Sequence, residues 1–125
     1  MAKFTADEVL DAPLTKVATC TRMVVTSAQP ANFAGIAAVA LADVTLTAGN
    51  GNGDYVIANG DTSGRKLTVG AQTGVNVDSN GTATHVCLDD GATLLSVTTC
   101  TSQVLTAGNT VDVPAYDLEF ADVTP

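Results

Sequence analysis

Glycine and asparagine interrupt the chain at short intervals from residue 48 onward, and this spacing limits the folds available to it. The turn-like runs are AGNGNGD at 48–54, ANGD at 58–61, SNG at 79–81, DDG at 89–91 and AGN at 107–109. The segments between them are rich in Val, Leu, Ile and Thr, which favour strands. Short strands separated by such turns are typical of all-β folds. We therefore expect a mainly β protein, either a β-sandwich or a jelly-roll-like barrel.

The expected strands are 22–27, 43–47, 54–58, 65–69, 74–77, 82–88, 93–99, 103–106 and 110–119. One further segment, FAGIAAVAL at 33–41, fits a helix and a strand equally well, and both remain open.

The first stretch, FTADEVLDAPLTKVATC at 4–20, predicts a short helix. Thr5 and Glu8 have the spacing of a capping box. Apolar residues expected on one helix face are Val9, Leu10, Leu14 and Val17. Pro13 predicts a kink or a junction of two short turns, because proline lacks the backbone donor that a helix interior needs. We expect an N-terminal helical segment or arm over 1–20 and a single β domain over 21–125, since 125 residues suit one domain.

The charge balance excludes some partners. Thirteen Asp and Glu against five Lys and Arg give a net charge of −8, which opposes binding to nucleic acid or to an anionic membrane. No basic, apolar leader of a secretory signal is visible at the start, and no apolar run approaches the roughly 18 residues of a membrane span. We expect a protein made in the cytosol, with neither nucleic acid nor membrane as partner.

The stretch TATHVCLDDG at 82–91 is the strongest candidate for chemistry, because it holds the only histidine beside a cysteine and two aspartates. If Asp90 and Gly91 are the centre of a tight hairpin, Leu88 faces Thr93 and Cys87 faces Leu94. Residues then assigned to the core face are Val86, Leu88, Leu95 and Val97, with His85 and Cys87 on the other face. A zinc site needs three or four converging ligands, and a catalytic cysteine needs a base. We predict a strand and a turn, with no cofactor; the alternative is a small metal-dependent hydrolase that uses His85 and Cys87.

Two other stretches allow a binding role. GNGNGD at 49–54 predicts a turn, with an incidental calcium contact through Asp54 or Asp61 as the alternative. In SGRK at 63–66, Arg65 and Lys66 either pair with carboxylates of a neighbouring subunit or form a solvated surface pair.

Three runs carry a family resemblance, namely GNGDYVIANGDTSGRKLTV at 51–69, NGTATHVCL at 80–88 and LLSVTTCTSQVLTAGNTVDVPAY at 94–116. They resemble small virion structural proteins of tailed bacteriophages and prophages. The resemblance implies a non-enzymatic capsid decoration (cement) protein that binds the major capsid protein on the outer surface of the mature head and stabilises contacts between capsomers. It also implies a homo-oligomer, a trimer before a dimer, located in the virion.

Chain ends can dock into grooves or add to sheet edges, so segments 3–14 and 111–120 are the predicted contact elements. The candidate capsid or subunit contacts are Phe4, Leu10, Leu14, Arg65, Lys66, Leu118 and Phe120. A rival function is a tail-tip or spike component for host recognition, although such surfaces usually expose more aromatic side chains than this chain has. A cellular β-sandwich module unrelated to phages is a further alternative.

Overall fold

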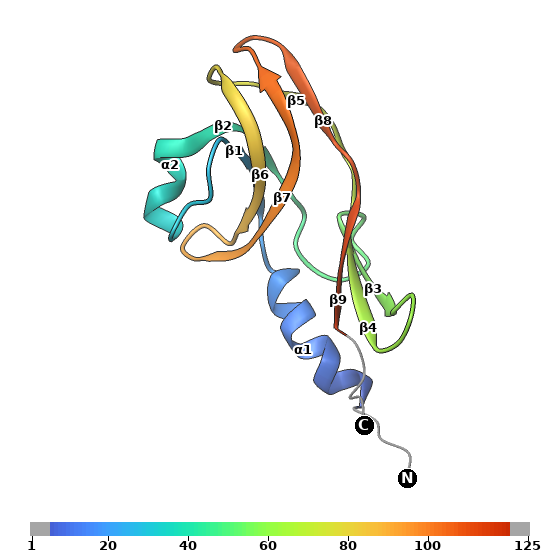
Figure 1. Ribbon diagram of the computed structural model, residues 1–125. Coiled ribbons are helices and arrows are strands. Elements are labelled where there is room, and N and C mark those ends of the chain that lie inside the picture. The colour runs from blue at the N-terminus through green and yellow to red at the C-terminus, as the bar shows by residue number, and fades with distance from the viewer. Residues whose placement is uncertain (1–5, 121–125) are drawn as a thin grey trace. The chain divides into compact units, whose positions relative to one another are not determined.

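The computed structural model describes residues 6–120, and it is mainly β with a short N-terminal helix and a sandwich-like arrangement of antiparallel sheets, as expected (Figure 1). The contacts divide the chain into two compact units. The helix unit combines Met1–Thr19, Thr47–Ala71 and Pro114–Pro125, and the sandwich unit combines Cys20–Leu46 and Gln72–Val113. Contacts therefore group the helix with distant strands. The predicted boundary at residue 20 stays a prediction.

The helix unit consists of one helix and one three-stranded antiparallel sheet. Its helix is α1 (Asp7–Val17), and its strands are β3 (Tyr55–Asn59), β4 (Arg65–Val69) and β9 (Tyr116–Phe120), in the order β3-β4-β9. Cross-strand pairing aligns Ile57, Leu67 and Leu118 on one face. That face points toward α1, because Arg65 on it bonds to Asp11 of the helix. Tyr55, Leu67 and Val69 are completely buried there.

Helix α1 departs in part from its prediction. It runs as one helix through Pro13, which is exposed, so the predicted junction of two short turns is wrong. Ala6 is the N-cap and makes no side-chain capping bond, while Thr5, the expected cap, lies outside the described residues. Leu14 is completely buried, but Val9 is 58% exposed and does not share its face.

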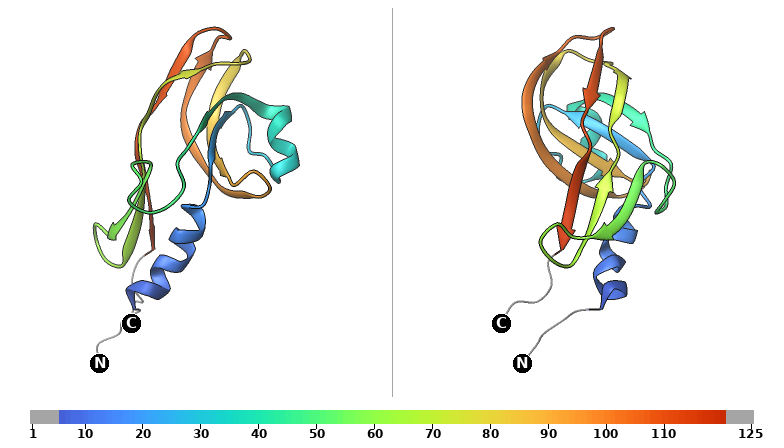
Figure 2. Two further views of the ribbon diagram at one scale, coloured as in Figure 1. Left: turned by 180° about the vertical axis from the view of Figure 1, so that it is seen from behind. Right: turned by 90° about the vertical axis from the view of Figure 1, so that its right-hand side faces the viewer.

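The sandwich unit is built on the four-stranded antiparallel sheet β2-β1-β6-β7. Its strands are β1 (Arg22–Thr26), β2 (Ala40–Thr45), β6 (Gly81–Asp89) and β7 (Leu94–Leu105), and a second sheet pairs β5 (Gln72–Asn76) with β8 (Thr110–Val113). Within this unit, α2 (Ile36–Val39) lies on one side of the larger sheet and β5 and β8 lie on the other (Figures 1 and 2). The segment 33–41 is therefore both structures in turn, a short 3-10 helix (η1, Phe33–Gly35) with α2, followed by the start of β2.

Strand β6 is buried on both faces, because layers cover both sides of its sheet. On one face Cys87 packs with Val24 and Ile36. On the other face the buried side chains are Met23, Val25, Val86 and Leu88, and the smaller sheet contributes buried Val75, Val111 and Val113.

Two strand boundaries differ from expectation. The predicted strands 93–99 and 103–106 form one strand, β7, because Cys100, Thr101 and Ser102 between them include no glycine or proline to end it. The predicted strand 110–119 is divided into β8 and β9 at Pro114, which cannot donate a ladder hydrogen bond.

Candidate functional site

The histidine stretch forms a strand and a turn, but with a different register from the predicted one. Asp89 lies opposite Leu94, and Leu88 lies opposite Ser96. The turn holds four residues, 90–93, because the Asp90 carboxylate accepts hydrogen bonds from the backbone amides of Ala92 (3.0 Å) and Thr93 (2.7 Å). The two-residue turn predicted around Asp90 and Gly91 is therefore wrong, and every pairing derived from it shifts.

The structure does place His85 and Cys87 on one face of β6, but that face is covered. Cys87 is completely buried beside Ile36, and its Sγ lies 3.8 Å from Thr26 Oγ1. Burial raises the pKa of the Cys87 thiol, and the contact with Thr26 lowers it only in part. The His85 ring nitrogen Nδ1 lies 2.8 Å from Thr84 Oγ1. These contacts make Cys87 a packing residue rather than an exposed thiolate.

Within residues 6–120, no three or more His, Cys, Asp or Glu side chains are grouped so that they could hold a metal ion. The two aspartates proposed for calcium already have partners. Asp54 accepts a hydrogen bond from the Thr47 amide at 2.6 Å, and Asp61 pairs with Lys66 at 2.7 Å. The glycines of GNGNGD adopt the positive φ of a turn, with 105° at Gly49, 85° at Gly51 and 91° at Gly53.

An ion pair between the buried carboxylate of Asp89 and the partly exposed Arg22 was missed by the sequence reasoning. Asp89 is completely buried and accepts a hydrogen bond from Arg22 Nε at 2.9 Å, in addition to one from the Gly91 amide at 3.0 Å. Asp43 lies 4.0 Å from the same guanidinium, which also sits 5.9 Å from the centre of the Phe33 ring. No sequence signal identified this pair, because Arg22 and Asp89 are 67 residues apart and meet only through the pairing of β1 with β6.

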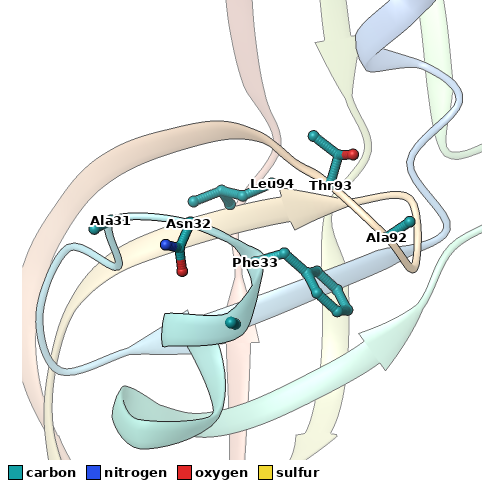
Figure 3. Close-up of a pocket in the computed structure, with 7 residues that line it drawn as sticks. Ala31, Asn32, Phe33, Ala92, Thr93 and Leu94 are labelled. Atoms are coloured by element: carbon teal, nitrogen blue, oxygen red, sulfur yellow. The ribbon is translucent and has the colours of Figure 1, made fainter.

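A shallow pocket of about 430 Å³ lies in the sandwich unit beside this arginine–phenylalanine contact (Figure 3). Its lining comes from the loop before α2 and from the turn between β6 and β7, and comprises Ala31, Asn32, Phe33, Ala34, Ala92, Thr93 and Leu94. None of these side chains is charged. The pocket can receive a small apolar group but offers no acid, base or nucleophile.

Arg65 and Lys66 find their carboxylate partners within their own chain. Arg65 Nε lies 2.8 Å from Asp11 of α1, and Arg65 Nη1 lies 3.9 Å from Asp7. Lys66 Nζ lies 2.7 Å from Asp61 and 3.6 Å from Asp117. The hydrogen bond that Arg65 donates to Asp11 raises the pKa of Arg65, and the one that Lys66 donates to Asp61 raises the pKa of Lys66. Arg65 and Lys66 thus form ion pairs within the helix unit. Neither sequence alternative, pairing with a neighbouring subunit or a solvated surface pair, anticipated this.

The remaining predicted contact residues occupy different environments. Leu10 and Leu118 are half-buried, Leu14 is completely buried, Phe120 is 44% exposed, and Phe4 lies outside the described residues. The large apolar side chains exposed in the described part of the chain are Val9, Val56, Val104 and Phe120. Three of these four belong to the helix unit.

Comparison with known proteins adds no relative. The sequence matches no protein-family model, no curated protein and no solved structure at a significant level. Among the described helices, none has the length and apolar character required to cross a membrane.

Proposed function

We propose that this protein is a non-enzymatic structural protein of a tailed-bacteriophage virion, a decoration or cement protein on the outer surface of the mature head. Made in the host cytoplasm, it binds the major capsid protein and stabilises contacts between capsomers. The starting point is the resemblance of runs 51–69, 80–88 and 94–116 to small phage virion proteins.

One structural observation carries the proposal. The two predicted contact segments come from opposite ends of the sequence, yet α1 and β9 both lie against β4 in the helix unit. Phe120 pairs with Arg65 across the two strands, and the Arg65 guanidinium reaches Asp7 and Asp11. One end of the helix unit therefore gathers parts of both segments, and we call the residues Asp7, Leu10, Asp11, Arg65 and Phe120 the contact end.

The contact end has the mixed character of a protein-binding surface. Phe120 exposes an aromatic side chain and Leu10 remains half-buried, while charged groups surround them. Aromatic and arginine side chains are the residues most often responsible for binding energy at interfaces. A modest contact of this kind is sufficient for a decoration protein, because a homo-oligomer engages several symmetric sites at once. A trimer suits a three-fold position on the shell, and a dimer suits a two-fold position.

The packing of Cys87 and Asp89, both in the histidine stretch, agrees with a structural role. Cys87 fills the core of the sandwich unit, and Asp89 neutralises Arg22. Their burial gives each of them a function in folding that requires no substrate.

The proposal is tested by binding purified protein to mature heads that lack it and measuring the bound fraction by cosedimentation. Phe120→Ser should weaken binding about tenfold, as expected for truncation of an interface aromatic residue. Val56→Ser is the matched control, because Val56 is 47% exposed but lies on the opposite face of the same sheet. Absence of binding by the unaltered protein, or equal losses in both variants, would refute the proposed surface.

A further inference from the structure

Asparagine is followed directly by glycine at four places in the chain. The pairs are Asn50-Gly51, Asn52-Gly53, Asn59-Gly60 and Asn80-Gly81. Asparagine is chemically labile, because the backbone nitrogen of the next residue can attack its side-chain amide. A following glycine presents that nitrogen without a side chain to obstruct it. By sequence alone the four pairs are similarly reactive, so the fold has to distinguish them.

In two of the pairs, a hydrogen bond already engages the attacking nitrogen. The Gly51 amide donates to the carbonyl oxygen of Tyr55 at 2.8 Å, and the Gly60 amide donates to the carbonyl oxygen of Gly64 at 2.9 Å. The corresponding glycine of the pair in the sandwich unit, Gly81, is the first residue of β6 and lies opposite Leu105 of β7. Its backbone is therefore held in the extended conformation of a strand.

The side-chain oxygen of the asparagine is also held in these three pairs. It accepts a hydrogen bond from the Ile57 amide at Asn50 (2.9 Å), from Arg65 Nη1 at Asn59 (2.8 Å) and from the Ala107 amide at Asn80 (2.8 Å). Attack on the side-chain carbon requires the side chain to rotate toward the next backbone nitrogen. Each of the three pairs must break at least one hydrogen bond before it can react.

The remaining pair, Asn52 and Gly53, lacks these restraints. Both residues are exposed, and within residues 6–120 the Gly53 amide has no hydrogen-bond partner. Gly53 belongs to no strand and has a φ of 91°. The Asn52 side chain donates from Nδ2 to the carbonyl oxygen of Ala48 at 2.7 Å. That bond engages the nitrogen that would leave and not the nitrogen that would attack.

We propose that Asn52 is a site of spontaneous deamidation in the folded protein. The Gly53 amide nitrogen loses its proton and bonds to Cγ of Asn52, the bond between Cγ and Nδ2 breaks, and ammonia leaves with that proton. A water molecule then opens the five-membered succinimide ring at either carbonyl carbon, which gives aspartate or isoaspartate. The product carries one negative charge more than the net −8 of the unmodified chain. The reaction needs only water, so the inference does not rest on the proposed function.

The modification should loosen the loop in which it occurs. The bond from Asn52 to Ala48 closes a turn around Gly49, whose amide donates to the carbonyl oxygen of Ala18, the C-cap of α1, at 2.8 Å. A carboxylate cannot donate the bond to Ala48, and it places a negative charge beside the carbonyl oxygen instead. Deamidation therefore weakens the turn that attaches this loop to the end of α1.

The test is peptide mapping by mass spectrometry, with fragmentation to locate each site, after incubation of the full chain in mildly alkaline buffer with and without concentrated urea. In the folded protein, Asn52 should deamidate at least about tenfold faster than the other three asparagines, because their hydrogen bonds must open first. In urea the four rates should become similar. Equal rates in the folded protein, or protection of Asn52 by folding, would overturn the proposal.

Substitution identifies the source of the new acidic form, which ion-exchange chromatography separates by its added charge. Asn52→Gln should abolish its rapid appearance, because the longer side chain closes a six-membered ring much more slowly. Asn109→Gln is the matched control, since Asn109 is also an exposed turn asparagine but precedes threonine. Equal accumulation of the acidic form in the Asn52→Gln variant and the unaltered protein would refute Asn52 as the site.

Asn52→Asp imitates one product and tests the effect on the loop. Hydrogen exchange of the Gly49 amide should accelerate about fivefold, as expected for the loss of one hydrogen bond. Exchange of the Gly91 amide, which is bonded to Asp89 in the sandwich unit, should not change. Unchanged exchange at Gly49 would refute the predicted loosening of the turn.

Discussion

At the scale of single residues, Asp89 is the one charged side chain among those described that is fully buried. The sequence predicted a strand and a turn in the stretch that holds Asp89 but not its pairing with Arg22, because that pairing depends on the register of β1 against β6. The register between strands that are distant in sequence is set by the packing of the whole sheet. The local sequence pattern carries no information about that packing. The same dependence explains why the turn after Asp89 was predicted with two residues instead of four.

Asp89→Ala should lower the free energy of unfolding by about 2 kcal/mol, because it removes a buried partner of Arg22 and of the Gly91 amide. Asp43→Ala removes a carboxylate from the same arginine at 4.0 Å, but Asp43 has a side chain that is 46% exposed. The change at Asp43 should stay within about 0.5 kcal/mol. Urea unfolding of the two variants measures both values, and equal losses would show that burial of the Asp89 carboxylate is unimportant.

Asp43 also makes stability depend on pH. Burial raises the pKa of its carboxyl above 3.8, and the neighbouring Asp78 raises the pKa further, while Arg22 partly opposes them. Ionised Asp43 is therefore less favourable in the folded state than in the unfolded one. Folding gains stability as the pH falls through the raised pKa toward 3.8, and this gain is absent at neutral pH.

Asp78→Asn should consequently increase the free energy of unfolding at pH 7, by less than about 0.5 kcal/mol because the site is partly exposed and screened. The increase should shrink as the pH falls toward 3.8, because Asp43 takes up its proton below its raised pKa. Asp112→Asn is the control, since it removes one negative charge from an exposed position elsewhere in the same unit. Equal, pH-independent effects of the two substitutions would show a general charge effect instead.

At the scale of elements, the turn chemistry was the most predictable part of the fold. Glycine positions such as Gly91 and Gly108 adopt a positive φ, at 90° each, in the turns that the sequence indicated. The ambiguous segment 33–41 contains both a helix and a strand, so neither single assignment could succeed. The break between β8 and β9 was missed because Pro114 stands within a β-forming run that was predicted as one strand. The strand β7 was divided in two although no glycine or proline interrupts it.

The association of α1 with β4 was not predictable, because it depends on Arg65 meeting Asp7 and Asp11 across the chain. Arg65→Gln should loosen α1 and accelerate hydrogen exchange of its amides. Lys66→Gln, the matched control, removes a cation whose partners, Asp61 and Asp117, lie outside the helix. Exchange in α1 should therefore stay unchanged in the control. If both variants accelerate α1 exchange equally, Arg65 has no specific role in holding the helix.

At the scale of the whole molecule, composition and turn spacing predicted the mainly β class, and the structure confirms it. The grouping into two discontinuous units was not foreseen, because each unit draws on segments far apart in the sequence. The strand and the turn predicted around His85 and Cys87 are present, although Cys87 was placed outside the core. The proposed role in a virion is based on the resemblance to small phage virion proteins and on the contact end of the helix unit. It has to be tested on the assembled particle.

The most direct test of that role is the copy number of this protein in purified virions, measured by quantitative mass spectrometry against the major capsid protein. A decoration protein should be present in a simple lattice proportion, such as equal numbers or one copy for every three capsid subunits, because symmetry repeats its site over the shell. A handful of copies per particle would place the protein in the tail and refute decoration of the head. Its absence from virions would contradict a structural role in the particle altogether.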